Sequence, residues 1–286
     1  MNRASNRHAL VLESVAEMRR RPAHAAEQVS QVVLGTPLMV LSRTRSDAWW
    51  RVEAPDGYKG WIRSWSLHPA SRSEAAAYRN GPGVEVDSLV ARVRERPSGR
   101  SLPVREAPIG SRLRRLGRAG RWIRVVLPDG ATGFLHARDL LLDRRTFRPR
   151  QRPKDIPALL ATAHRFLGVP YQWGGVTAKG VDCSGLVQTV FRLHGVLLPR
   201  DARDQHRWVR ENAYLQADPL EMQFGHLLFF GAPRARVTHV ALGLARGRYL
   251  HARGRVRIGS LRAEDPEFDP ELFRLYRGSG PVLLRS

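Results

Sequence analysis

A segment of thirteen residues occurs twice in the chain, and this internal repeat constrains the fold more than any other feature. Residues 49–61 (WWRVEAPDGYKGW) align with residues 122–134 (WIRVVLPDGATGF), and seven of the thirteen aligned pairs are identical. In each copy a Pro-Asp-Gly turn separates two short strand-like stretches, which is the pattern of a β-hairpin. A further apolar strand is expected before each hairpin, over residues 35–41 and 110–116. The repeat therefore predicts two small all-β modules of about 65 residues each, whose short strands can close into barrels.

The charge of the chain is strongly positive, yet its distribution does not indicate a nucleic-acid partner. The 286 residues include 48 Lys+Arg and 26 Asp+Glu, a net charge of +22. Only Lys59, Lys154 and Lys179 are lysines, so 48 − 3 = 45 of the cations are arginines, and they occur in every segment. A nucleic-acid footprint needs cations that cluster on one face. We therefore expect no nucleic-acid partner, and a non-catalytic basic protein that binds polyanions is kept as the second alternative.

Composition and missing motifs also bear on location and cofactors. Hydrophobic residues make up 42% of the chain, which excludes a disordered protein. No apolar run approaches the roughly 18 residues of a membrane span, and residues 1–22 lack the apolar stretch of a secretion signal. The sequence contains no HExxH motif, no cysteine pair and no glycine-rich phosphate loop, which are the patterns of metal and nucleotide sites. We expect a cytoplasmic monomer with no membrane partner, no metal and no cofactor.

The pattern changes after the repeat. Residues 144–154 are rich in arginine and proline, which disfavour regular structure and predict a linker. Beyond it, apolar residues at helical spacing predict two helices and apolar runs predict three strands: helices over 156–167 and 184–193, and strands over 227–230, 237–244 and 249–252. The predicted domains are a first barrel at 1–72, a second barrel at 73–143, the linker at 144–154 and an α+β domain at 155–286.

The single cysteine, Cys183, cannot form an internal disulfide. It lies in the sequence GVDCSGLV at 180–187, where a glycine-flanked loop turns into the second predicted helix. Unpaired N–H groups and the helix dipole stabilise negative charge at this place. We therefore predict a lowered pKa for the Cys183 thiol and a role as a nucleophile; the alternative is an inert buried cysteine.

A thiolate nucleophile needs a base, and His239 is the best placed of the ten histidines. It opens a predicted strand, and its neighbours on the same face, Ala241 and Gly243, are small enough for the Cys183 helix to lie close. His251 follows twelve residues later, after a turn, so the chain can fold back and bring it behind His239. A third polar group of this kind orients the base and fixes its tautomer. The alternative for each histidine is a purely structural role in a strand.

Five short blocks resemble the NlpC family of cell-wall cysteine peptidases in order and spacing. The blocks are YQWGG at 171–175, DCSG at 182–185, LPRDA at 198–202, THVA at 238–241 and HA at 251–252. The resemblance extends over residues 155–286 and implies a circularly rearranged papain-like fold. It also implies that Cys183 is the nucleophile, His239 the base and His251 the third polar residue. Tyr171 would line the site near the oxyanion, and Trp173 would either wall the cleft or brace Tyr171.

The two β modules resemble bacterial SH3-like domains, because each has a basic segment that ends in proline: MRRRP at 18–22 and VRERP at 93–97. Two such modules before a peptidase of this kind resemble the γ-D-glutamyl-L-diamino acid endopeptidases that recycle murein peptides. That resemblance implies cleavage after D-Glu in a murein-derived peptide with a free N-terminal L-Ala. It further implies that the ammonium of L-Ala contacts Asp182, Ser184 and Glu27. Trp61 stands where this group often has a tyrosine.

Two positions depart from the pattern of the group. Ala202 replaces the serine common in its Pro-Arg-Asp-Ser block, which removes one hydrogen bond to the substrate. His226 replaces an aspartate that we take to be structural, so we expect local repacking. The prediction is thus an α+β cysteine peptidase preceded by two SH3-like barrels, and the first alternative is a secreted lytic endopeptidase on polymeric murein whose barrels bind the wall.

Overall fold

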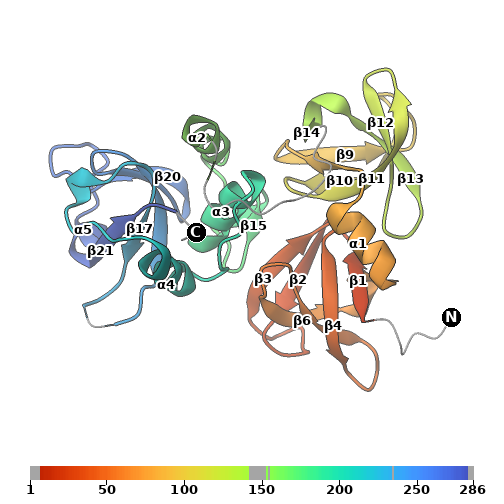
Figure 1. Ribbon diagram of the computed structural model, residues 1–286, viewed down its shortest axis with the longest axis horizontal. Helices are drawn as coiled ribbons and strands as arrows, with labels where there is room; N and C mark the ends of the chain where they lie inside the picture. The colour runs from red at the N-terminus through yellow and green to blue at the C-terminus, as the bar shows by residue number, and fades with distance from the viewer. Residues whose placement is uncertain (1–6, 142–152, 154, 234, 283–286) are drawn as a thin grey trace. The chain divides into compact units, whose positions relative to one another are not determined.

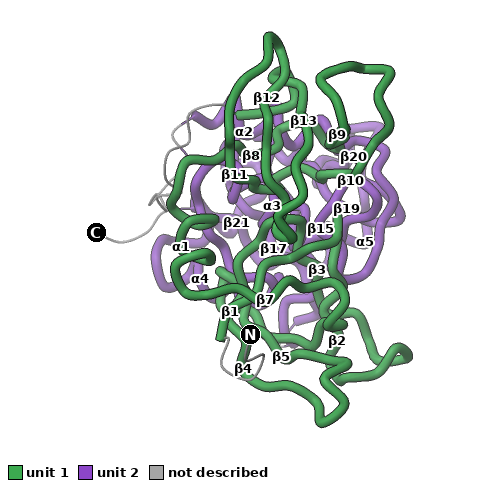
Figure 2. The backbone as a smooth tube through the Cα atoms, turned by 90° about the vertical axis from the view of Figure 1, so that its right-hand side faces the viewer, with its two compact units in different colours: residues 1–147 green, residues 148–286 purple. Residues whose placement is uncertain are grey.

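The computed structural model describes residues 7–141, 153, 155–233 and 235–282, and the chain divides into two compact units, residues 1–147 and 148–286 (Figures 1 and 2). Among these described residues, no helix has both the length and the apolar character that a membrane crossing requires. The linker predicted at 144–154 lies outside the described residues except for Pro153.

The first barrel is a seven-stranded sheet over residues 8–70. Its strands in chain order are β1 (His8–Val11), β2 (Val15–Arg19), β3 (Gln28–Val33), β4 (Pro37–Arg43), β5 (Trp49–Glu53), β6 (Lys59–Arg63) and β7 (Leu67–Ala70). Their order in the sheet is β3-β2-β6-β5-β4-β1-β7. Strands β5 and β6 form the predicted hairpin, with Trp49 opposite Arg63.

The second barrel repeats this arrangement after helix α1 (Arg72–Asn80). Its strands are β8 (Gly83–Val86), β9 (Val90–Arg94), β10 (Pro103–Pro108), β11 (Arg112–Ala119), β12 (Trp122–Val126), β13 (Thr132–His136) and β14 (Leu140–Leu141). Their order is β10-β9-β13-β12-β11-β8-β14, which is the order of the first barrel with each number raised by seven. The duplication predicted from the repeated segment is confirmed.

In both barrels, glycines with a left-handed backbone conformation form the turns that precede or join the strands. Gly57 and Gly130, in the Pro-Asp-Gly turns, have φ of 81° and 87°. Gly35 and Gly110 both have φ of 78°, which an extended strand does not accommodate. The upstream strands predicted to start at these two glycines therefore begin two residues later, with β4 and β11.

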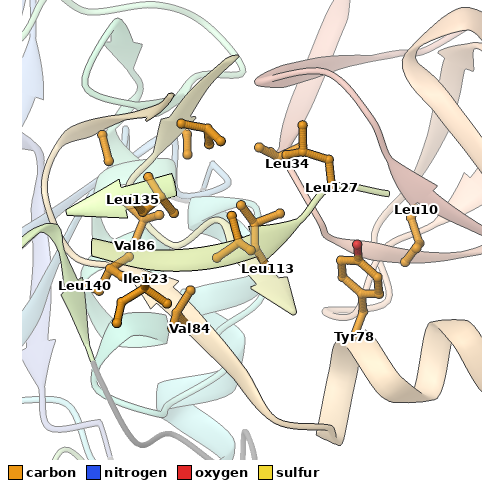
Figure 3. Close-up of a cluster of buried hydrophobic side chains, with 14 of the residues drawn as sticks. Leu10, Leu34, Tyr78, Val84, Val86, Leu113, Ile123, Leu127, Leu135 and Leu140 are labelled. Atoms are coloured by element: carbon orange, nitrogen blue, oxygen red, sulfur yellow. The ribbon is translucent and has the colours of Figure 1, made fainter. Parts of the chain in front are cut away.

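The first barrel has a hydrophobic core of its own, and the core of the second barrel also takes in side chains from the first (Figure 3). Leu10 and Leu34 of the first barrel and Tyr78 of α1 pack in the same cluster as the buried side chains of the second barrel. The backbones also meet, because a Cβ atom on Gly35 would lie 1.8 Å from the carbonyl oxygen of Arg112. The boundary predicted between residues 72 and 73 falls inside α1.

The second unit is an antiparallel sheet packed with helices. Its helices are α2 (Ile156–His164), α3 (Cys183–Leu193), α4 (Ala202–Asn212) and α5 (Pro270–Leu275), and its strands are β15 (Val176–Thr177), β16 (Gly180–Val181), β17 (Phe224–Phe230), β18 (His239–Leu244), β19 (Arg248–Arg253), β20 (Arg255–Ser260) and β21 (Tyr276–Gly280). Strands β15 and β16 pair with each other, and the main sheet has the order β20-β19-β18-β17-β21. Helix α3 is almost wholly buried and packs against β18 and β19. The α+β class predicted from the sequence is confirmed, and the start of α3 lies against the sheet.

Several predicted boundaries differ from the observed ones: β17 begins three residues earlier than predicted, at Phe224, and α3 and β19 each begin one residue earlier. Helix α2 ends at His164 instead of residue 167, because tighter i to i−3 bonds from Phe166 and Leu167 close the chain before Gly168. Strand β18 begins at His239 instead of residue 237. Helices α4 and α5 and strands β15, β16, β20 and β21 were not predicted; α4 is polar overall, and its few apolar residues lie on one face.

Candidate active site

Helix α3 begins at Cys183, and the side chain of Asp182 caps it. Asp182 Oδ1 accepts a hydrogen bond from the N–H of Gly185 at 2.7 Å, and Oδ2 accepts one from the N–H of Gly174 at 2.8 Å. Position 185 has no room for a side chain, because a Cβ atom there would lie 2.1 Å from the carbonyl oxygen of Gly175. The predicted place of Cys183 at a helix N-terminus is confirmed.

A buried arginine completes this cap. Arg200 donates to Asp182 Oδ1 at 3.0 Å and Oδ2 at 2.6 Å, and to Ser184 Oγ at 2.9 Å. Ser184 Oγ in turn donates to Asp182 Oδ1 at 3.3 Å. All three residues are buried, so Asp182 and Ser184, the predicted amine contacts, already have partners inside the protein. Arg200 was given no role from the sequence, and only its place in the LPRDA block could have pointed to one.

The thiol of Cys183 is only 7% exposed and lies between α3 and β18. The backbone N–H groups of Val240 and Ser184 favour the thiolate and so lower the pKa of the Cys183 thiol. Burial nevertheless raises the pKa of the Cys183 thiol to about 11, with a further increase from the charge of Asp182. The predicted lowering of this pKa is therefore wrong for the resting site, because desolvation outweighs the helix N-terminus.

The structure brings His239 and His251 together. His239 is the first residue of β18 and His251 lies in the middle of β19, and their Nε2 and Nδ1 atoms are 2.9 Å apart. Because Nε2 of His239 is engaged with His251, Nδ1 is the nitrogen that can serve the thiol. Burial lowers the pKa of both rings, and nearby arginines lower each further.

The prediction that small residues beside His239 make room for the Cys183 helix is only partly correct. A Cβ atom at Gly243 would meet the carbonyl oxygens of Gln223 and His226, at 2.9 and 3.2 Å. The absence of a side chain at Gly243 thus makes room for the backbone at the start of β17, and not for the helix that carries Cys183. Helix α3 packs against β18, and the backbone of Val240, next to His239, lowers the pKa of the Cys183 thiol.

Tyr171 and Trp173 lie in the loop between α2 and β15. The N–H of Tyr171 donates to the carbonyl of Gly254 at 2.9 Å. Burial raises the pKa of the Tyr171 phenol, and the negative charge of a Cys183 thiolate raises it next, so the phenol is a neutral donor close to the thiol. Trp173 is 61% exposed, which fits a surface wall better than an internal brace.

Glu27 and Trp61 belong to the first unit. Glu27 lies just before β3, and its Oε2 accepts a hydrogen bond from Arg20 Nε at 2.6 Å. Trp61 lies on β6 opposite Arg51 of β5. Their part in a substrate site stays a prediction.

Ala202 and His226, the two residues that depart from the family pattern, are both buried in the second unit. Ala202 is the first residue of α4 and is buried, and Asp201 precedes it as the N-cap. His226 lies on β17 and is 4% exposed, with its ring at 6.5 Å from that of Tyr214. Burial lowers the pKa of His226, so a neutral ring occupies this position.

Comparisons with known proteins identify the two parts of the chain. Residues 168–273 match the NlpC/P60 family, and residues 14–68 match the bacterial SH3 domain. The second unit therefore carries an NlpC/P60 domain, and the first barrel is a bacterial SH3 domain.

Relatives and solved structures agree with this identification. The γ-D-glutamyl-L-lysine dipeptidyl-peptidase of Bacillus cereus is 32% identical over 202 residues, which cover 69% of this chain and 57% of that protein, little more than half its length. Dipeptidyl-peptidase 6 of Lysinibacillus sphaericus is 26% identical over 275 residues, which cover 93% of this chain and 96% of that protein. The crystal structure of an NlpC/P60 family protein from Bacillus cereus has the same fold, with a TM-score of 0.81 and 24% identity over 96% of this chain and 99% of that one. These matches support a peptidase of the NlpC/P60 type.

Proposed function

We propose that this chain is a cysteine endopeptidase that hydrolyses the γ-D-glutamyl-L-diamino acid bond of murein-derived peptides with a free N-terminal L-Ala. One observation carries the proposal: Cys183 starts a helix that packs against β18, the strand that begins with His239, and His239 is hydrogen-bonded to His251. A sulfur nucleophile beside an oriented imidazole is the arrangement that cysteine peptidases use. The two relatives named dipeptidyl-peptidases support release of an N-terminal dipeptide, and one of their names gives the γ-D-glutamyl-L-lysine bond.

The resting thiol is neutral, so the reaction begins with a proton transfer. As Cys183 Sγ bonds to the γ-carbonyl carbon of D-Glu, its proton passes to His239. The oxyanion lies at the N-terminus of α3, where N–H groups can donate, and the Tyr171 phenol is a further donor. When the C–N bond breaks, His239 returns the proton to the departing amine of the diamino acid.

Hydrolysis of the thioester follows the same route with water. His239 takes one proton from the attacking water, the C–S bond breaks, and the sulfur regains a proton from His239. The products are L-Ala-D-Glu and the diamino acid with whatever follows it. His251 keeps the His239 ring in one orientation throughout.

Recognition of the free amine is the finer part of the proposal. Asp182 is buried, and its two oxygens already accept from Gly174, Gly185, Ser184 and Arg200, so it has little left to offer an ammonium. Glu27 is also paired, with Arg20, but its side chain is 39% exposed, so its carboxylate is the accessible acid among the predicted contacts. We therefore assign the charge recognition to Glu27 and a hydrogen-bonding part to Ser184.

The test compares L-Ala-γ-D-Glu-meso-diaminopimelate with its N-acetylated form, with products identified by mass spectrometry. We expect L-Ala-D-Glu from the free peptide and at least about tenfold slower turnover of the acetylated one, since the recognising acid loses its partner. Cys183→Ala should abolish cleavage, and His239→Ala should cost more than His251→Ala, with the exposed His164→Ala as the matched control. No cleavage of either peptide would refute the peptidase, and equal rates would refute the amine requirement and favour action on polymeric murein.

A further inference from the structure

Arg257 contacts His251 through the ring nitrogen that His239 does not use. His251 and Arg257 face each other across strands β19 and β20. The Nε–H group of Arg257 donates to His251 Nε2 at 3.4 Å, while His251 Nδ1 is 2.9 Å from His239 Nε2. These three side chains thus form one line of hydrogen bonds that ends at His239, the first residue of the strand against which the Cys183 helix packs.

Asp269 helps to hold Arg257 in this position. Its Oδ2 atom is 3.7 Å from an Arg257 terminal nitrogen and 2.9 Å from Arg253 Nη1. Its Oδ1 atom accepts from the N–H of Leu272 at 3.0 Å and so caps α5. The Arg257 side chain is 42% exposed, so it reaches His251 from the surface and does not form part of the core.

The direction of each hydrogen bond in this line follows from the arginine. A guanidinium nitrogen can only donate, so His251 Nε2 accepts and the ring carries its proton on Nδ1. That Nδ1–H donates to His239 Nε2, so neutral His239 carries its own proton on Nδ1. If His239 gained a second proton, its Nε2–H would face the Nδ1–H of His251, and one of the two donors would lose its acceptor.

We propose that Arg257 is a positioning residue that holds the His239–His251 pair in this tautomer and opposes protonation of His239 when no peptide is bound. It acts through His251 and keeps the resting Cys183 and His239 neutral. To accept the thiol proton at Nδ1, His239 must first carry its own proton on Nε2, which requires the Arg257–His251 bond to open so that His251 exchanges its Nδ1 proton for one on Nε2 and accepts from His239 Nε2–H. The consequence for catalysis rests on the proposed function.

Other charged groups around the two rings do not replace this effect. The groups that face them, besides each other, are Asp182 at the N-cap of α3, Tyr249 and Arg253 from β19, Arg257 from β20 and Asp269 before α5. Arg253 and Arg257 disfavour a further positive charge, whereas Asp182 and Asp269 favour it. Among these groups, the structure gives Arg257 a hydrogen bond to the second nitrogen of His251.

The experiment is nitrogen-15 NMR of the histidine side chains in the full chain without peptide, with pH titration. In the unaltered protein we expect His251 protonated at Nδ1. Arg257→Gln should release His251 to the Nε2–H tautomer and raise the pKa of His239 by about one unit. Alkylation of Cys183 by iodoacetamide near pH 7 should then become several-fold faster. Arg255→Gln is the matched control, since it removes the same charge from the same exposed face of β20.

The outcomes separate this proposal from its alternatives. An unchanged His251 tautomer and an unchanged His239 pKa in Arg257→Gln would overturn it. Equal shifts in Arg255→Gln would also overturn it, because the effect would then be one of net charge. The backbone amide spectrum checks that each variant is folded. Because these measurements need no substrate, a failure of the peptidase proposal is recognised separately, by absent peptide cleavage.

Discussion

Replacing Arg200 by methionine removes the cation that pairs with Asp182 at the start of the nucleophile's helix. The Arg200 side chain is 1% exposed, and its hydrogen bonds include two to Asp182 and one to Ser184. Its loss leaves Asp182 as a buried carboxylate that keeps the N–H groups of Gly174 and Gly185 and the hydroxyl of Ser184. Removal of one partner from a buried ion pair costs about 3–5 kcal/mol, and the three remaining donors place this case near the lower value.

Hydrogen exchange followed by mass spectrometry measures this cost in the second unit alone. Peptides from α3 should exchange roughly two orders of magnitude faster in Arg200→Met, because each 1.4 kcal/mol corresponds to a factor of ten. The matched control is Arg203→Met, whose side chain is 51% exposed and pairs with Asp204, and which should cost at most about 0.5 kcal/mol. Asp182→Asn combined with Arg200→Met should cost less than the sum of the two single changes. A loss in Arg200→Met below about 1 kcal/mol, or equal to that of Arg203→Met, would refute the argument from burial.

Two further predictions concern the titrating groups. Without peptide, alkylation of Cys183 should be slow at pH 7 and should rise with pH towards the thiol pKa of about 11; a rate that is already constant below pH 7 would show a preformed thiolate. The buried neutral histidines should make the second unit less stable in acid, because the pKa of His239 falls to about 4 on folding while the unfolded chain binds protons near 6.5. Stability that is complete above pH 6.5 should therefore decline as the pH falls towards 4, by about 1–3 kcal/mol for this ring. The free energy of unfolding, measured by hydrogen exchange on β17 and β18 at several pH values, checks this, and a constant value over that range would contradict it.

The parts of the fold that the sequence predicts are those with a local signal. Seven identities in thirteen residues reveal the duplicated hairpin, and a glycine-flanked Asp-Cys-Ser places Cys183 at a helix start. Both features depend on neighbouring residues only, so they can be recognised before any long-range contact is known. The starts of β4 and β11 were displaced only because two glycines adopt positive φ.

The electrostatics of the site could not be predicted in the same way. Whether a helix N-terminus lowers the pKa of Cys183 depends on how deeply the thiol is buried, and burial is decided by β18, more than fifty residues away. Likewise, Arg200 and Arg257 are two among 45 arginines in the sequence, and only tertiary contacts distinguish them from the exposed ones. The assignment of Asp182 as an amine contact left out its internal partner for the same reason.

Because the core of the second barrel takes in side chains from the first, the two copies of the repeat are no longer interchangeable. Leu34 and Gly35 occupy the positions that Ile109 and Gly110 hold in the second copy, with the same φ at both glycines. Yet Leu34 belongs to the core of its sister module, and Gly35 leaves no space for a side chain beside Arg112. A substitution at Leu34 therefore affects the packing of the second barrel as well as its own, whereas Ile109 does not appear in the core of the first barrel. Deletion of the first barrel would therefore open the hydrophobic core of the second, whereas the first barrel also keeps a core of its own.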